Sequence, residues 1–297
     1  MNVIKGLNLV SLLAVPLMIG LLAGGFHPQA QAAQPSRPPT ELVVEAVRAE
    51  LAADQNDHSL WRYRDEQKQQ DDSISIVVQT DSGAVRRLIS RYGRPLTPAE
   101  VHAENNRINN FIQDPSLLAK QRRDGAQDDK SARDLLNMLP TAFLWRVERE
   151  DADTLRLHFE PNPGFAPPSL QARVLSAMNG ELVVDKSQHR IETISGRLTR
   201  DVTIGFGFLG RLRAGGTFRV ERRQVAPNLW QITETHVHID GKALFFKNIS
   251  QQQDEVQTDF TQVPGNTTLE QAAQMSNPEP PAVHEPEPPS SSHAHRN

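Results

Sequence analysis

Cysteine is absent from the 297 residues of this chain, and its absence excludes several kinds of chemistry. The chain has no disulfide bonds, no thiol nucleophile and no cysteine that could carry a lipid anchor. It also lacks a G-x-S-x-G nucleophile elbow, a phosphate-binding P-loop and an H-E-x-x-H zinc motif. No other catalytic constellation emerges, so we expect a protein that is not an enzyme.

Excess positive charge is missing as well. The chain has 32 Lys and Arg against 36 Asp and Glu, a formal net charge of -4 at pH 7. Binding to a nucleic-acid backbone needs a concentrated positive field, so we expect no nucleic-acid partner. A group of arginines on expected strands and turns is interpreted as a solvated sheet face, or alternatively as a recognition surface for a carboxylate or an anionic headgroup. The group consists of Arg86, Arg87, Arg91, Arg94, Arg219, Arg222 and Arg223.

Charge is almost absent from the N-terminal segment, where Lys5 is the only charged side chain before Arg37. An apolar run follows Lys5, and Ala30-Gln31-Ala32 has the small-x-small pattern of a signal-peptidase site. We expect residues 1–32 to be a signal peptide that is cut after Ala32, giving a periplasmic or secreted protein without a transmembrane segment. An uncleaved anchor is the alternative, because the apolar run approaches the ~20 residues that span a bilayer.

Two stretches of the sequence have helical patterns. Residues 33–40 form a Pro-rich spacer, and residues 41–53 then place apolar side chains at helical spacing. Thr97-Pro98-Ala99-Glu100 combines a capping threonine, a proline at the first helical position and a glutamate at the third. It opens a helical insertion of about residues 97–140. Within it we expect a mobile loop over residues 121–130, followed by a second helix that stops at Pro140.

Most of the remaining segments alternate apolar and polar residues as half-buried strands do. The expected strands cover residues 61–68, 73–80, 85–92, 143–148, 154–160, 182–185, 191–198, 218–225, 229–239, 243–250 and 251–260, the last of which finishes the sheet. Residues 202–212 are expected to form one strand that bends sharply at its glycines. We expect a single domain over residues 41–262 and a disordered tail rich in Pro, Glu, Ser and His over residues 263–297.

Two local patterns could carry chemistry. Residues 205–210 match the G-x-G-x-x-G fingerprint, but no helix opening follows them, so we expect a structural bend and no dinucleotide site. His236, His238 and Asp240 could present three metal ligands on one face of a strand. The alternate positions, including Val237, are more apolar, so we expect the histidines to face solvent. We therefore expect no metal and no cofactor.

Several sequence blocks resemble known exported proteins. Some look like landmarks of an uncharacterised group of bacterial exported proteins: Trp61–Arg64, Arg86–Ile89, Gly93–Leu96 and Pro163–Pro168. Gly180–Asp185 is similar to the G-x-L-W-I-D strand of the outer-membrane lipoprotein-sorting proteins, the lipoprotein-carrier superfamily, with Val183 in place of the usual tryptophan. Asp240–Lys247 and Thr258–Phe260 fit the same pattern. The resemblance covers residues 60–260 and implies an α+β fold, in which helices cover the concave face of a strongly curved antiparallel β-sheet, a half-barrel.

The resemblance also implies an apolar cavity for acyl chains. We therefore expect a non-catalytic periplasmic protein that binds a lipid, a lipoprotein acyl chain or another amphiphile, with residues 97–139 as a lid. The candidate cavity or lid residues are Trp61, Tyr63, Leu135, Met138, Phe143, Trp145, Phe206, Phe208, Phe245 and Phe246. In the alternative interpretation these side chains fill the core, and the protein is an envelope interaction or sensor module with a protein partner. A third alternative, a hydrolase of envelope material, would require converging polar side chains in a deep pocket.

Overall fold

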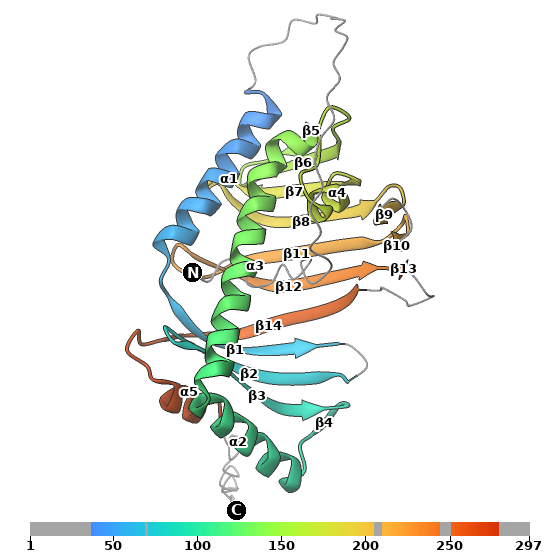
Figure 1. The fold of residues 1–297 in the computed structure, drawn as a ribbon. Helices are drawn as coiled ribbons and strands as arrows, with labels where there is room; N and C mark the ends of the chain where they lie inside the picture. The colour runs from blue at the N-terminus through green and yellow to red at the C-terminus, as the bar shows by residue number, and fades with distance from the viewer. Residues whose placement is uncertain (1–36, 69–70, 205–209, 244–250, 279–297) are drawn as a thin grey trace, which may run out of the picture.

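The computed structural model describes residues 37–68, 71–204, 210–243 and 251–278, which form an α+β fold (Figure 1). The main sheet is antiparallel and open, with eleven strands in the order β4-β3-β2-β1-β14-β12-β11-β8-β7-β6-β5. Its strands are β1 (Leu60–Gln67), β2 (Ser73–Thr80), β3 (Gly83–Arg91), β4 (Arg94–Pro95), β5 (Phe143–Glu150), β6 (Thr154–Pro161), β7 (Met178–Asp185), β8 (Arg190–Leu198), β11 (Thr217–Ala226), β12 (Leu229–Ile239) and β14 (Gln251–Val263). The prediction of an α+β fold built on an antiparallel sheet is confirmed.

The described part of the chain contains five helices. They are α1 (Pro39–Asn56), α2 (Pro98–Gln113), α3 (Pro115–Ala142), α4 (Leu170–Leu175) and α5 (Leu269–Met275). Figure 1 shows α3 running across the strands on the same face of the sheet as α1, with α2 and α5 near the β3 end. None of the helices in the described ranges is both long and apolar enough to cross a membrane.

The first and last strands of the main sheet meet near its centre. β1 pairs with β2 on one side and with β14 on the other, and β14 in turn pairs with β12. Residues 251–260 lie in β14, which is the last strand of the described chain as expected, but β14 is an interior strand and not an edge strand of the sheet. Turn residues indicate which neighbouring segments pair, but they carry no information about a partner at the other end of the chain.

A small three-stranded sheet replaces the single bent strand expected over residues 202–212. β9 (Val202–Ile204) and β10 (Gly210–Leu212) are separate short strands that pair antiparallel, and β13 (Gly241–Ala243) pairs with the other side of β10. Glycine favours a bend within one strand as much as the end of a strand, so the glycine pattern alone does not distinguish one bent strand from two separate strands. Residues 205–209 and 244–250 lie outside the described ranges.

Local capping chemistry explains where α2 begins. The Thr97 hydroxyl accepts a hydrogen bond from the Glu100 amide, and the Glu100 carboxylate accepts one from the Thr97 amide at 2.7 Å. Glu100 also pairs with Arg94 at 2.8 Å. These bonds satisfy amide groups that a helix N-terminus otherwise leaves without partners.

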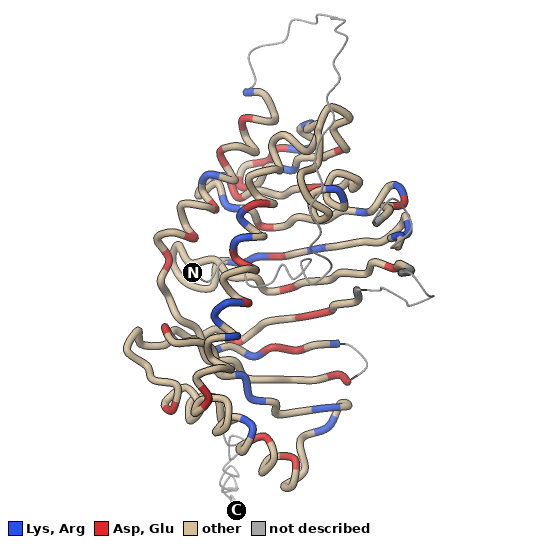
Figure 2. Tube along the Cα trace, viewed as in Figure 1, with Lys and Arg blue, Asp and Glu red and all other residues tan. Residues whose placement is uncertain are grey.

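The predicted loop over residues 121–130 is wrong, because α3 is a continuous helix through this segment. Lys120 pairs with Asp124, and Lys130 with Asp134, each at 2.5 Å and four residues apart, which favours helix. Figure 2 shows both signs of charge along α3. Pro140 was expected to stop the helix, but it lies in the last turn, and the helix ends at Ala142.

The tail predicted to be disordered from residue 263 is ordered in its first part. α5 begins with a capping box formed by Thr268 and Gln271 and buries Ala272. Arg87 of β3 donates hydrogen bonds to the Ser276 hydroxyl at 2.9 Å and to the Ala273 carbonyl at 3.1 Å. The folded unit therefore extends past residue 262 to α5, since a short apolar face and one buried arginine offset its polar composition. Residues 279–297 lie outside the described ranges.

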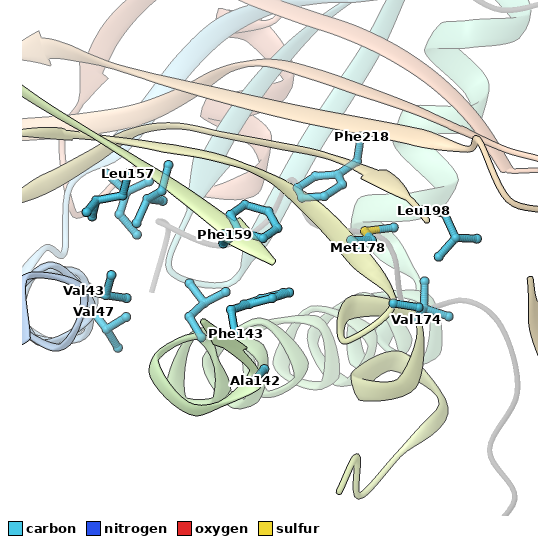
Figure 3. Close-up of a cluster of buried hydrophobic side chains, with 14 of the residues drawn as sticks. Val43, Val47, Ala142, Phe143, Leu157, Phe159, Val174, Met178, Leu198 and Phe218 are labelled. Carbon is cyan, nitrogen blue, oxygen red and sulfur yellow. The ribbon is translucent and has the colours of Figure 1, made fainter. Parts of the chain in front are cut away.

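The largest hydrophobic cluster lies between the helices and the strands β5 to β8, β11 and β12. Figure 3 shows Val43 and Val47 of α1 pointing toward Leu157, with Phe143 beside Phe159. The phenyl rings of Phe143 and Phe159 have centroids 4.5 Å apart. This cluster attaches α1 and the C-terminal half of α3 to one face of the sheet.

Two glycines make room for aromatic rings in this cluster. Gly180 of β7 and Gly196 of β8 lie opposite each other in the sheet. A Cβ atom on Gly180 would lie 2.8 Å from Cζ of Phe159, and one on Gly196 would lie 2.6 Å from Cε1 of Phe218. At Gly196 the ring occupies the space of the missing side chain. At Gly180 the backbone of β8 is closer still, because a Cβ atom would lie 1.9 Å from the Ser195 carbonyl oxygen and 2.6 Å from Cα of Gly196.

Candidate functional site: a cavity beneath helix α3

The C-terminal half of α3 covers an apolar cavity. The helix comes close to the sheet at its two ends, at β3 and β5. Between them, a cavity of about 90 Å³ lies beneath the C-terminal half of the helix. Its walls come from α1, α3, α4 and the strands β7, β8, β11 and β12: Glu50, Ala132, Leu135, Leu136, Leu139, Gln171, Leu175, Met178, Ile191, Ile194, Phe218, Val220, Arg222 and Ile232.

The sequence places these side chains on one face by ordinary periodicity and by a β-bulge. Ala132, Leu135 and Leu139 recur at helical spacing along α3, and Phe218 and Val220 alternate along β11. Ile191 and Ile194 are three residues apart, which would put them on opposite faces of a regular strand. The register of β7 and β8 shifts between Val183 and Val184, so that both isoleucines line the cavity.

A buried ion cluster interrupts the apolar wall. The side chains of Glu50, Arg190 and Arg222 are 2%, 6% and 8% exposed. One oxygen of Glu50, Oε1, accepts hydrogen bonds from Nε of Arg190 at 3.0 Å and from the amide of Ile191 at 2.7 Å. The other oxygen accepts one from Nη2 of Arg190 at 3.1 Å and pairs with Nη1 of Arg222.

The charges in this cluster do not balance. Burial alone would raise the pKa of Glu50, but the positive charge of Arg222 and the hydrogen bond and charge of Arg190 lower it overall. Glu50 is therefore ionised, and a single carboxylate faces two guanidinium groups. Arg222 contacts Glu50 only through Nη1. Its Nε and Nη2 atoms are buried without an acceptor among the residues that the structure describes.

A second, larger cavity of about 660 Å³ lies beneath the N-terminal half of α3, against β1, β2 and β3. Charged side chains of both signs line it, including Arg86 and Asp128. Gln121 of α3 spans it, accepting a hydrogen bond from the amide of Ala84 at 2.8 Å and donating one to the Ala84 carbonyl at 2.9 Å. The lining of this cavity is therefore more polar than that of the apolar cavity.

The predicted cavity residues fall into three groups. Leu135 lines the apolar cavity, and Tyr63 lines the polar one. Trp61 packs with Tyr63 and Val77, while Met138, Phe143 and Trp145 belong to the large core cluster. Phe206, Phe208, Phe245 and Phe246 lie outside the described residues.

The charged residues of the apolar cavity were missed or only partly recognised. Arg222 belongs to the arginine group interpreted mainly as a solvated sheet face, but it is buried. The sequence alone assigns no role to Glu50. Its position does predict that it is buried, because Val43, Ala46, Val47 and Glu50 follow the i, i+3, i+4, i+7 pattern of the buried face of α1.

The histidine pair of β12 is held by one carboxylate. Nδ1 of His236 lies 2.8 Å from Oδ1 of Asp254, and Nε2 of His238 lies 2.7 Å from Oδ2 of the same residue. Within the described ranges, no group of three or more His, Cys, Asp or Glu side chains has a metal-binding arrangement. The Asp254 carboxylate therefore acts here as a shared hydrogen-bond partner for two imidazoles.

No family model, curated protein or solved structure matches this chain. The structure itself defines an α+β protein in which helices cover one face of an open antiparallel sheet, with an apolar cavity between the helices and the sheet.

Proposed function

We propose that this protein is a non-catalytic binding protein that holds the apolar part of an amphiphile, such as a lipid or a lipoprotein acyl chain, between α3 and the sheet. The observation that supports the proposal is the apolar cavity beneath the C-terminal half of α3. Ligand sites are typically concave and mostly apolar, with a few polar groups that fix the orientation of the ligand. The cavity has this composition, with Glu50 and Arg222 as its charged groups.

The cavity is small in this conformation. Its volume of about 90 Å³ is below the roughly 300 to 1,000 Å³ of typical ligand pockets. An acyl chain would therefore enter only when α3 moves away from the strands. The contacts that would resist this motion lie toward the ends of α3: Gln121 bonds to Ala84 of β3, and the indole of Trp145 donates to the Leu139 carbonyl at 3.1 Å.

In this proposal residues 97–139 are the lid, and the sheet is a curved half-barrel of the lipoprotein-carrier kind. The arrangement of the helices supports the proposal, because α1 and α3 lie on the same face of an open sheet (Figure 1). The proposal also includes export to the periplasm after cleavage behind Ala32, for which the sequence pattern is the support.

Native mass spectrometry of protein purified from the periplasm without detergent tests the proposal. We expect a mature chain that begins at Ala33 and carries a lipid, which organic extraction then identifies. Ala132→Leu should reduce lipid occupancy, because Ala132 is buried in the cavity wall. Asp134→Leu, on the exposed face of the same helix, is the matched control and should leave occupancy unchanged. An apo mass that persists after incubation with a lipid extract would contradict the proposal.

The alternative function is an interaction module with a protein partner, and two observations favour it. The cavity is small, and the edge strand β5 exposes apolar side chains, with Leu144 56% and Val147 41% exposed. An unpaired edge can add a strand from another chain. Replacing Leu144 and Val147 with lysine should abolish such an interaction without changing lipid occupancy. Native mass spectrometry detects both a protein complex and a bound lipid, so it separates the two functions.

A further inference from the structure

We infer that the amphiphile carries a carboxylate, and that this carboxylate binds the free edge of Arg222 in the cavity wall. The inference rests on the proposed function, and it adds the chemical class of the ligand. It follows from the charge balance of the buried cluster and from the particular nitrogen atoms of Arg222 that lack an acceptor.

The charge balance favours one additional negative group. Among the described residues, Glu50 is the only carboxylate in ion-pair contact with Arg190 or Arg222. Asp54, one turn further along α1, pairs with Arg133 at 3.3 Å. One positive charge therefore remains without a counter-charge among buried side chains, where an opposite charge is most effective.

The geometry of Arg222 favours a group with two coplanar oxygens. A guanidinium binds a carboxylate side-on through Nε and Nη2, whose N–H groups point in the same direction. Arg190 uses this edge to hold Glu50, at 3.0 and 3.1 Å. Arg222 contacts Glu50 through Nη1 and leaves the same edge, Nε and Nη2, without an acceptor. The free edge matches the group that Arg190 already binds.

The position of Arg222 places its side chain beside the apolar wall. Phe218, Val220 and Arg222 alternate along β11 and face the same cavity. A ligand with its carboxylate on Arg222 would thus lay its hydrocarbon part against Phe218, Val220 and the α3 leucines. A fatty acid combines these two parts in one molecule.

Isothermal titration calorimetry of the mature protein with dodecanoate and dodecanol at pH 8 tests the inference. Both ligands have the same chain, and at this pH dodecanoate carries a full negative charge. We expect dodecanoate to bind at least about tenfold more tightly than dodecanol, as a charge-assisted bidentate contact predicts. Arg222→Met should remove this preference. Arg223→Met is the matched control, because Arg223 is the next residue, is exposed, and pairs with Glu221 at 3.1 Å.

Each outcome has a defined meaning. Equal binding of dodecanoate and dodecanol by the wild-type protein would overturn the inference and leave the proposed function standing. Binding of neither ligand would overturn both. Loss of the preference in Arg223→Met as well would also overturn the inference, because it would assign the effect to general surface charge. If circular dichroism shows that Arg222→Met does not fold, the comparison of dodecanoate with dodecanol in the wild-type protein still decides whether the site prefers a carboxylate.

Discussion

Replacement of Glu50 with glutamine should destabilise the fold more than a typical substitution does. The variant keeps the shape of the side chain and removes its charge, which leaves Arg190 and Arg222 buried without a counter-ion. Removing one partner of a buried ion pair costs about 3–5 kcal/mol, against about 0–1 kcal/mol for an exposed pair. The larger figure applies because all three side chains are less than a tenth exposed.

The expected loss is large relative to the total free energy of unfolding, which is about 5–15 kcal/mol for natural domains. A triple variant with methionine at positions 50, 190 and 222 should lose much less, since it leaves no uncompensated charge and adds apolar surface to the core. The comparison between the single and the triple variant separates the cost of an unpaired charge from the net contribution of the cluster.

Urea unfolding at pH 7, followed by circular dichroism, measures both effects. Glu41→Gln is the control, because Glu41 lies on the exposed side of the same helix. The lowered pKa of Glu50 gives a second test: its contribution to stability is present above the ordinary value of 4.5 and is lost as pH falls through the lowered folded-state pKa. The acid-dependent loss should therefore be smaller in Glu50→Gln than in the wild-type protein. A loss below about 1 kcal/mol at pH 7, equal to that of the control, would refute the argument.

Three further substitutions test other parts of the fold. Gly196→Ala should lower the free energy of unfolding by about 2 kcal/mol or more, because its Cβ would lie 2.6 Å from Cε1 of Phe218; an unchanged urea midpoint would contradict this. Gly125→Ala should raise the free energy of unfolding by about 0.5–1 kcal/mol, since Gly125 is helical and its Cβ would meet no atom within 4 Å. Burial raises the pKa of Tyr63 to about 12, so its stabilising effect is lost as pH rises through that value; Tyr63→Phe should remove the tyrosinate absorbance that appears near pH 12.

The elements that local sequence determines were predictable. The capping box at Thr97 and Glu100 and the apolar spacing around Val43 and Val47 both correspond to observed helices. The sequence predicts a loop within α3, over residues 121–130, because Gly125 and a dense run of charged residues are typical of loops. A helix tolerates one glycine when ion pairs four residues apart and packing at both ends stabilise the rest.

The site was less predictable, because its parts come from distant positions. Glu50 and Arg190 are 140 residues apart, and no local pattern indicates that they meet. Two of the aromatic candidates, Phe143 and Trp145, are not among the residues that line this cavity. Phe143 and Trp145 pack against Phe159, with ring centroids 4.5 and 5.3 Å from it, so they fill space in the core. Aliphatic side chains line most of the cavity instead.

The pairing of β1 with β14 has a consequence for how the chain reaches its folded state. The two strands are separated by most of the domain, so their contact raises the contact order and slows folding. Until residues 251–263 are in place, β1 and β12 each present an unpaired edge to other chains, and such edges promote aggregation. Docking of the last strand thus removes two of the edges through which the sheet could self-associate and leaves those of β4 and β5.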